Sequence, residues 1–370
     1  MTMTPADEVA ALFNPVRVGS LNLPNRIVMS PMTRSFSPGG IPGEDVAAYY
    51  RRRAEGGVGL IVTEGTGIGD EAAIDDPAIP HMHGSAALDG WRRVVAEVHA
   101  AGGLIAPQLW HQGPLRNPSL ATRSEIEGLR PSGHWGTPGV VSYAASYVEA
   151  MRRPTRPMTE ERILSVIAAY ADAAAAAKMA GFDAVAIHGA HGYLIDTFLW
   201  ADTNRRTDRW GGSIAERSEF AAEVVRAVRQ AVGPEFPILF RFSQHKQQDY
   251  KARLALTPEE LGRLLRPIAE AGVNIFDASA RRFYEPAFPG DPRPLAAWAK
   301  ELTGLPAIAV GSAGLVPEGR PSVAARMIAA GSFDLLGVGR GLLQDPRWAQ
   351  RVRQGEEPQA VDSNSHRILT

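Results

Sequence analysis

Short apolar segments alternate with amphipathic segments along the chain, and this alternation constrains the fold more than any other feature. Eight apolar segments have the length expected of strands, and several are continuous apolar runs, as is typical of parallel strands covered on both faces. They are residues 26–32, 59–65, 104–110, 184–190, 238–243, 275–280, 307–313 and 335–340. The intervening segments have helical periodicity, so the chain reads as a series of βα units.

Two of these helices carry start and stop signals. Thr257 is a capping threonine with a proline after it and with Glu260 three residues later, and Gly272 ends the pattern. A second helix is predicted to begin after Thr159, whose next two residues are acidic, and to end at Gly181.

Eight βα units in series predict an α/β fold, a closed (β/α)8 TIM barrel in which residues 1–370 form one domain. The alternative is an open, doubly wound sheet, which is less favoured because no GxGxxG pattern follows the first predicted strand. Residues 111–158 interrupt the rhythm and are rich in Pro, Gly and Ser. Because a structureless loop of this length is uncommon in a compact domain, we expect a short hairpin there that caps the barrel mouth.

Composition excludes several classes of protein. The net charge is −1, from 39 basic and 40 acidic residues, which gives no overall attraction to nucleic acid or to an anionic membrane. The chain has no cysteine, so it offers no disulfide, thiolate nucleophile or iron–sulfur ligand set. No apolar stretch has the length of a signal peptide or a membrane span, and we expect a cytoplasmic protein.

The carboxyl ends of the strands form the active-site face in such barrels. Where the predicted strands end, the residues are polar, aromatic or glycine: Ser30, Pro31, Met32, Thr33, Gly65, Thr66, Gln108, Trp110, His188, His191, Tyr193, Arg241, Ser279, Gly311, Ser312, Gly339 and Arg340. Their shared placement indicates a functional site more strongly than any one of them does.

The last two strand ends suggest a phosphate site. Gly311, Ser312, Gly339 and Arg340 follow the seventh and eighth predicted strands, where TIM barrels commonly bind phosphate. Glycines let backbone N–H groups approach an anion, and Arg340 adds a planar charged donor. The alternative is that the glycines only permit tight turns, but Arg340 favours phosphate.

Arg241 and Gln108 also end apolar strands. A charge at such a position needs a partner, so Arg241 either forms an internal salt bridge or faces an electron-rich cofactor ring. Gln108 can both donate and accept hydrogen bonds, as an amide-containing ring would require.

His188, His191 and Tyr193 place two imidazoles and a phenol within six residues. A metal site is not favoured, because His111 is the only nearby candidate for a third ligand. Two neutral imidazoles can instead donate hydrogen bonds to one substrate oxygen and stabilise charge there, with Tyr193 as a proton source.

Three segments together resemble the Old Yellow Enzyme family of FMN-dependent ene-reductases. The opening LFNPVRVGSLNLPNRIVMSPMTR resembles the start of that family, and HGAHGYLIDTFL resembles its substrate motif H-x-x-[HN]-G-Y. The segment TNRRTDRWGGSIAERSEF is similar to the family's R-T-D-x-[YW]-G-G-S-x-x-x-R pattern. The resemblance covers nearly the whole chain.

The resemblance implies a bound FMN. It implies that Ser30, Pro31, Met32 and Thr33 line the flavin ring and that Gly65 and Gln108 contact its pyrimidine edge. It also implies that Arg241 faces the N1–O2 region and that Gly311, Ser312, Gly339 and Arg340 hold the phosphate. Thr33 stands where some relatives have a cysteine.

For the substrate, the resemblance implies that His188 and His191 bind the oxygen of an activating group and that Tyr193 protonates the α-carbon of an activated alkene. Trp110, Phe283 and Tyr284 are expected to wall the substrate pocket; the alternative for them is packing at the barrel rim. The polar segment 243–256 follows no recognisable pattern, and a solvated loop is the favoured interpretation over a role in shaping the pocket.

The implied activity is ping-pong reduction of α,β-unsaturated carbonyls or nitroalkenes by NADPH or NADH, and nitro compounds or nitrate esters are further candidates. Two other functions stay open. A flavin-binding protein without reductase activity would have no need of the two histidines and the tyrosine. A flavin-free lyase or aldolase is remote, because no lysine ends a predicted strand. We expect a monomer or homodimer.

Overall fold

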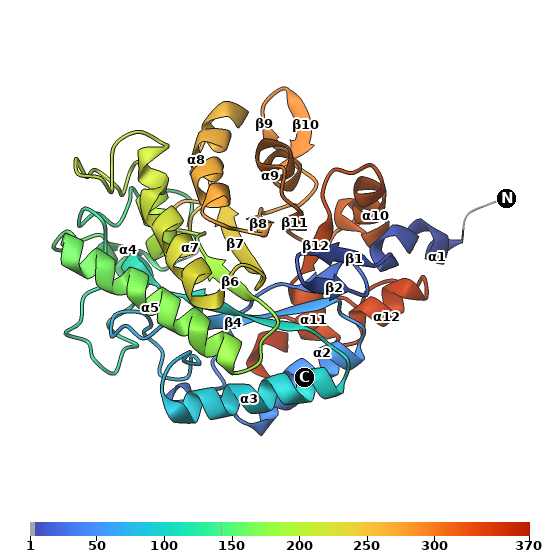
Figure 1. Cartoon of the computed structure of the whole chain (residues 1–370). Helices are drawn as coiled ribbons and strands as arrows, with labels where there is room; N and C mark the ends of the chain where they lie inside the picture. The colour runs from blue at the N-terminus through green and yellow to red at the C-terminus, as the bar shows by residue number, and fades with distance from the viewer. Residues whose placement is uncertain (1–3, 142) are drawn as a thin grey trace.

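The computed structural model describes residues 4–141 and 143–370. At its centre eight parallel strands close into a barrel, in the order β11-β12-β3-β4-β5-β6-β7-β8 (Figure 1). These strands are β3 (Ile27–Met29), β4 (Leu60–Gly67), β5 (Ile105–Trp110), β6 (Val185–His188), β7 (Ile238–Ser243), β8 (Ile275–Ser279), β11 (Ala307–Val310) and β12 (Leu335–Val338). The pairing of β12 with β3 closes the barrel, which confirms the predicted fold and excludes the open sheet.

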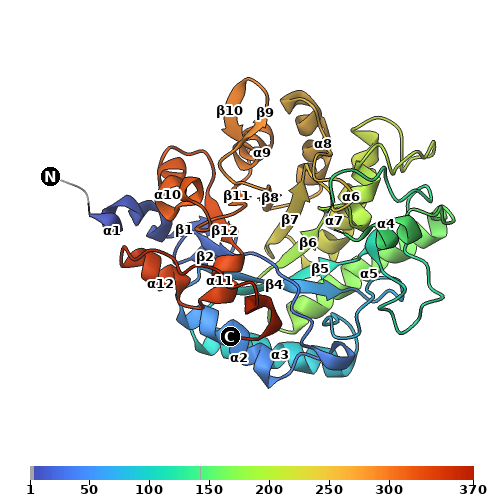
Figure 2. The same ribbon diagram turned by 180° about the vertical axis from the view of Figure 1, so that it is seen from behind.

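Helices surround the barrel, as Figures 1 and 2 show. The outer helices are α2 (Glu44–Glu55), α3 (Ser85–Ala100), α5 (Glu160–Met179), α7 (Glu219–Val232), α8 (Pro258–Glu270), α9 (Leu295–Thr303), α10 (Pro321–Ala329) and α12 (Trp348–Arg353). The two predicted helix starts are confirmed. The hydroxyl of Thr159 accepts a hydrogen bond from the Arg162 N–H, and that of Thr257 accepts one from the Glu260 N–H, each at 3.2 Å.

The barrel interior is apolar at its amino end. Leu60, Ile275 and Leu335 pack there against an antiparallel hairpin of β1 (Val16–Val18) and β2 (Leu21–Leu23). Burial of these side chains stabilises the fold through the hydrophobic effect. The polar strand ends all lie at the opposite, carboxyl end of the barrel.

The expected hairpin within residues 111–158 is wrong. The described part of this segment contains a 3-10 turn (Gly113–Leu115) and α4 (Ala145–Met151), and none of it forms a strand. Tyr147, Val148 and Met151 recur at helical spacing, and they pack in one apolar cluster with Leu115 and Trp135. Packing of that face, rather than strand pairing, decides the local structure.

Hairpins instead occur in two places that the sequence did not indicate. One is β1–β2, and the other pairs β9 (Pro286–Phe288) with β10 (Asp291–Pro294) after β8. Short helices complete the chain: α1 (Pro5–Glu8), α6 (Leu194–Leu199) after β6, and α11 (Arg340–Gln344) after β12. Within the described ranges, no helix combines the length and the hydropathy that crossing a membrane requires.

Candidate active site

A cavity of about 120 Å³ lies at the carboxyl end of the barrel strands. Every residue that lines it is one that the sequence analysis predicts: Pro31, Thr33, Gly65, Gln108, Trp110, His188, His191, Tyr193 and Arg241. They come from the ends of β3, β4, β5, β6 and β7, which are consecutive neighbours in the barrel. The closed barrel therefore brings together residues that are up to 210 positions apart, from Pro31 to Arg241.

His188 is the last residue of β6, and the residue is 6% exposed. Burial and the nearby Arg241 guanidinium hold its pKa well below the ordinary value, so the ring is neutral near pH 7. The Ala190 N–H donates to Nδ1 at 3.3 Å. Because Nδ1 accepts this bond, the proton of the neutral ring is on Nε2, which can donate to a ligand.

His191 has a left-handed backbone conformation, with φ at 64°. This unusual conformation turns the chain sharply, so that the rings of His188 and His191 lie 5.3 Å apart and nearly perpendicular. The His191 Nε2 lies 2.8 Å from the Ser279 Oγ, and the His191 backbone N–H donates to the Ser243 Oγ at 2.9 Å. Burial and the neighbouring His245 hold the pKa of His191 well below its usual range.

Tyr193 precedes α6, and its ring meets two others edge-on. The ring centroids are 4.9 Å from His188 and 5.0 Å from Trp110. Tyr193 also packs against the apolar cluster of Leu115, Trp135 and Met151, as Tyr143 and Tyr147 of the 111–158 excursion do. Burial, followed by the nearby Tyr143, raises the pKa of Tyr193 well above its ordinary value, so the phenol keeps its proton near neutral pH.

Arg241 at the end of β7 is held by β8, the neighbouring strand. Its Nη1 donates to the Asp277 Oδ2 at 2.8 Å and its Nη2 to the Ser279 Oγ at 3.2 Å. The ion pair that the sequence analysis gave as the alternative is therefore present, and Arg241 also lines the cavity. The sequence could have identified Asp277 as the partner of Arg241. Asp277 is an acid within the predicted apolar strand 275–280, which follows the strand that ends near Arg241.

The chemistry of the donors around the mouth fits a flavin. Among the buried polar atoms there that have no hydrogen-bond partner within the described residues are Ser30 Oγ, Gln108 Nε2 and Arg241 Nε. Buried polar groups are rarely left unpaired, so these atoms call for a polar ligand. A ring that presents carbonyl oxygens and ring nitrogens along one edge would satisfy all three.

Of the four predicted phosphate residues, Arg340 lines a second cavity, and Gly311, Ser312 and Gly339 do not. It has a volume of about 480 Å³ and is lined by Arg340, Arg320 and Gly314, among others. Gly311 has φ at 147°, and a Cβ there would lie 2.5 Å from the Ala280 carbonyl oxygen, so this turn requires glycine. Gly339 lies against the Met32 thioether, since a Cβ on it would meet that sulfur at 3.4 Å.

Phe283 and Tyr284 do not line the cavity that contains His188, contrary to the expectation that they wall the substrate pocket. Phe283 is 2% exposed, and its ring packs edge-on against Phe333, 6.1 Å away. Its N–H donates to the Gly311 carbonyl at 3.0 Å, which helps to fix the turn after β11. Rim packing describes this pair, and only Trp110 of the three expected wall residues lines the cavity.

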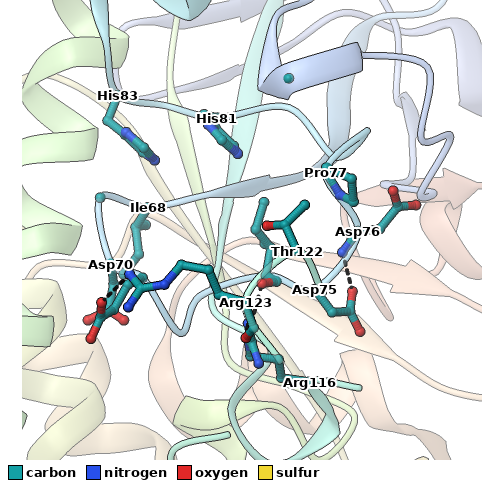
Figure 3. A pocket seen from close by; sticks show the side chains of 14 residues that line it. Ile68, Asp70, Asp75, Asp76, Pro77, His81, His83, Arg116, Thr122 and Arg123 are labelled. Carbon is teal, nitrogen blue, oxygen red and sulfur yellow. Dashed lines mark hydrogen bonds and ion pairs between the residues drawn. The ribbon is translucent and has the colours of Figure 1, made fainter. Parts of the chain in front are cut away.

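A further cavity of about 430 Å³ lies between the loop after β4 and the 111–158 excursion (Figure 3). His81 and His83 stack there at 4.7 Å. Its acidic groups already have partners, because Glu71 pairs with Arg123 and the carboxylate at position 75 accepts from the Gln112 amide and the Asn117 N–H. None of its lining residues reaches the cavity around His188, so we assign no function to it.

The polar segment 243–256 contacts the candidate site, which sequence reasoning missed. The Lys246 ammonium forms an ion pair with Asp196 at 2.9 Å, and both side chains are fully buried. Asp196 also accepts from the Gly192 N–H at 2.6 Å, and the Gln248 amide donates to the Gly192 carbonyl at 3.0 Å. The segment therefore holds Gly192, between His191 and Tyr193, directly through Gln248 and indirectly through the Lys246–Asp196 ion pair.

Comparison with known proteins agrees with this geometry. The model of the NADH:flavin oxidoreductase / NADH oxidase family matches residues 11–359. The chain is 34% identical to an NADH oxidase of Thermoanaerobacter brockii over 94% of its own length, which is 51% of that relative. It is 35% identical to 12-oxophytodienoate reductase 2 of Arabidopsis thaliana over 71% of its length and 68% of the relative.

The chain thus spans about half the length of the NADH oxidase that it matches. Among solved structures, morphinone reductase superposes with a TM-score of 0.80 at 29% identity, covering 96% of this chain and 92% of that one. A second structure of morphinone reductase, in complex with tetrahydroNAD, gives 0.79. With the match over residues 11–359 and a barrel mouth that fits a flavin, the chain belongs to the NADH:flavin oxidoreductase family, as its resemblance to Old Yellow Enzyme predicts.

Proposed function

We propose that this protein is an FMN-dependent reductase that takes reducing equivalents from NADPH or NADH and reduces the C=C bond of activated alkenes. The relatives include 12-oxophytodienoate reductase 2 of Arabidopsis thaliana and a chanoclavine-I aldehyde reductase of Penicillium roqueforti. Their names support an alkene next to a carbonyl group as the substrate. The flavin would be held by the residues proposed from the sequence, with Arg241 and Gln108 as donors to its ring and Arg340 near its phosphate. The chemistry that FMN supplies when bound is hydride transfer, from the nicotinamide to the β-carbon of the alkene.

His188 and His191 would bind the carbonyl or nitro oxygen of the substrate. The Nε2–H of His188 is free to donate, and both rings are neutral, so they bind oxygen without presenting a full positive charge. As negative charge develops on the substrate oxygen, these preplaced donors become stronger, which lowers the barrier more than it tightens ground-state binding.

Tyr193 would supply the proton. Reduction of a C=C bond adds a hydride to one carbon and a proton to the other, and the raised pKa of the phenol keeps that proton available near pH 7. The ring packs between His188 and Trp110, which restricts where the hydroxyl can lie. Trp110 would form one wall of the substrate pocket.

Ping-pong kinetics would follow if nicotinamide and alkene use the same face of the cavity in turn. The 111–158 excursion would cover that face, since Tyr193 packs against its apolar cluster of Leu115, Trp135 and Met151. A role as a flavin-binding protein without turnover explains none of these contacts. A flavin-free aldolase is disfavoured because Lys246, the lysine whose ion pair holds the turn between His191 and Tyr193, is fully buried.

The observation that carries the proposal is the cavity in which His188, His191 and Tyr193 meet Gln108 and Arg241. The test is to purify the protein, measure its flavin absorbance and follow NADH and NADPH oxidation with and without 2-cyclohexenone under anaerobic conditions. Bound FMN and alkene-dependent oxidation are expected. A protein that takes up no FMN, or that holds FMN but never reduces any activated alkene, contradicts the proposal.

A further inference from the structure

We propose that Arg253 and Arg281 form an anion-binding subsite beside the candidate active site, which takes a carboxylate or phosphate group carried by the enzyme's ligand. The inference rests on the proposed function, because the ligand's other end would lie over the flavin. It also gives a role to the polar segment 243–256, from which Arg253 comes.

The subsite is a cavity of about 110 Å³ between the segment after β7 and the loop after β8. His245, Tyr250, Arg253, Ser279, Arg281 and Arg282 are among the residues that line it. Ser279 joins it to the candidate active site, because its hydroxyl lies 2.8 Å from the His191 Nε2. The His245 ring lies 5.1 Å from the ring of His191. A ligand bound to His191 would thus have a neighbouring cavity within the length of a short side chain.

The charge of this cavity is not neutralised by the protein. Arg281 lies over the Tyr250 ring at 4.4 Å, and the Arg253 Nη1 donates to the Ala252 carbonyl at 3.1 Å. In the described chain neither guanidinium forms an ion pair with a carboxylate, and the one acid that lines the cavity, Glu285, pairs with neither. Other arginines close by do have acidic partners: Arg263 on α8 pairs with Glu259 and Arg293 pairs with Asp291.

Hydrogen bonds hold both arginines on a fixed backbone. The Arg281 carbonyl accepts from the Ser312 hydroxyl at 3.0 Å, and Ser312 also accepts from Arg282, whose guanidinium is thereby turned toward the predicted phosphate site. The Gln244 side chain accepts from the N–H groups of Leu254 and Ala255 at 2.8 and 3.1 Å. The residue before them, Arg253, is therefore placed by a closed loop rather than by a freely moving one.

The donors in the cavity match an oxyanion. Two guanidiniums supply charge-assisted hydrogen bonds, and the aromatic ring under Arg281 orients one of them. Burial and neighbouring cations lower the pKa of His245 to about 3, so its ring adds a neutral donor and no charge. A carboxylate on an activated alkene and a phosphate of the nicotinamide coenzyme share this chemistry, and the experiment distinguishes the two sources.

The test compares Arg253→Gln and Arg281→Gln with Arg263→Gln, a control that removes the same charge from a guanidinium already paired with Glu259. Steady-state kcat/KM is measured for an enone bearing a carboxylate on a short chain and for its methyl ester. Flavin reduction by NADH and by NADPH is followed separately under anaerobic conditions. Flavin content and thermal unfolding show that each variant is folded, and Arg281→Lys keeps the charge in case Arg281→Gln does not fold.

If the alkene carries the anion, the acid-to-ester ratio of kcat/KM falls at least about tenfold in both glutamine variants, equivalent to about 1.4 kcal/mol. If the coenzyme carries the anion, the apparent dissociation constant of the coenzyme, measured in flavin reduction, rises by a similar factor. It rises for NADPH alone when the subsite binds the extra phosphate of NADPH. It rises for both coenzymes when the subsite binds the pyrophosphate that they share. Glu285→Gln removes the repelling carboxylate and should shift whichever quantity responds in the opposite direction.

The subsite is contradicted if the acid-to-ester ratio and the dissociation constants of NADH and NADPH in both glutamine variants stay within about twofold of those of the Arg263→Gln control. That result is separate from failure of the proposed function, which the wild-type protein tests by itself: if it reduces the methyl ester, the function stands whatever the arginines do.

Discussion

The ammonium of Lys246 contacts both carboxylate oxygens of Asp196 at 2.9 Å, and neither side chain is exposed to solvent. The two residues are 50 positions apart, after β7 and within α6, and they meet because β6 and β7 are neighbours in the barrel. Asp196 also accepts the Gly192 N–H at 2.6 Å, so the ion pair fixes the turn that carries His191 and Tyr193.

Lys246→Met is expected to destabilise the protein by about 3–5 kcal/mol, because it leaves the Asp196 carboxylate buried without its counter-ion. Urea unfolding measures the loss. Lys300→Met is the matched control, since Lys300 pairs with Asp334 at the same distance of 2.9 Å but is 33% exposed. A pair that is partly exposed contributes about 1 kcal/mol or less. Equal losses in the two variants would show that burial of the Lys246 pair has no special weight.

His245 should make the protein sensitive to acid. Its pKa is lowered to about 3 in the fold, by burial and nearby cations, whereas the unfolded chain has the ordinary value of 6.5. The unfolded state therefore binds more protons between these values. The contribution to stability is complete above pH 6.5 and is lost as the pH falls toward 3.

Linkage puts this loss at about 2 kcal/mol between pH 7 and pH 5 for one such histidine. His245→Gln should reduce the fall in unfolding free energy over that range by the same amount, measured by urea unfolding with FMN in fixed excess. His366→Gln, at an exposed histidine, serves as the control. If both variants lose as much stability on acidification as the wild type, the imidazole at position 245 is not held neutral by the fold.

Gly311→Ala should weaken flavin binding. The added Cβ would lie 2.5 Å from the Ala280 carbonyl oxygen at a φ of 147°, so the turn after β11 would have to move. The measurement is the FMN dissociation constant by fluorescence titration, and an increase of at least about tenfold is expected, equivalent to about 1.4 kcal/mol. Gly290→Ala is a control at another positive φ where a Cβ would meet nothing within 4 Å. Unchanged FMN affinity in Gly311→Ala would remove this turn from the cofactor site.

The barrel and the cavity at its mouth were predictable because both depend on local sequence patterns. Apolar runs mark parallel strands, and in a closed barrel the residues at their carboxyl ends must meet; Gln108, His188 and Arg241 do so. The hairpin expected near Tyr147 was not predictable in this way, because the packing of one face of α4 against Leu115 and Trp135 decides its conformation.

Buried polar contacts were the other part that the sequence did not indicate. A lysine is normally exposed, so nothing local marks Lys246 as buried, and its partner Asp196 is identified only once β6 and β7 are known to be neighbours. For the same reason a polar run such as 243–256 reads as a solvated loop. Phe283 shows the converse error, since an aromatic residue just after a strand packs in the core instead of facing a ligand.

The central claim is that Tyr193 is the proton donor of a flavin-dependent alkene reductase, and the most direct measurement compares the two half-reactions in Tyr193→Phe by anaerobic stopped-flow absorbance. Loss of the phenol should slow flavin reoxidation by 2-cyclohexenone at least about a hundredfold, the lower end of the roughly 10²–10⁴-fold that general-acid catalysis contributes. Flavin reduction by NADH or NADPH should stay within about threefold of the wild-type rate, equivalent to less than 1 kcal/mol. Equal slowing of both half-reactions, or no slowing of reoxidation, would contradict the account.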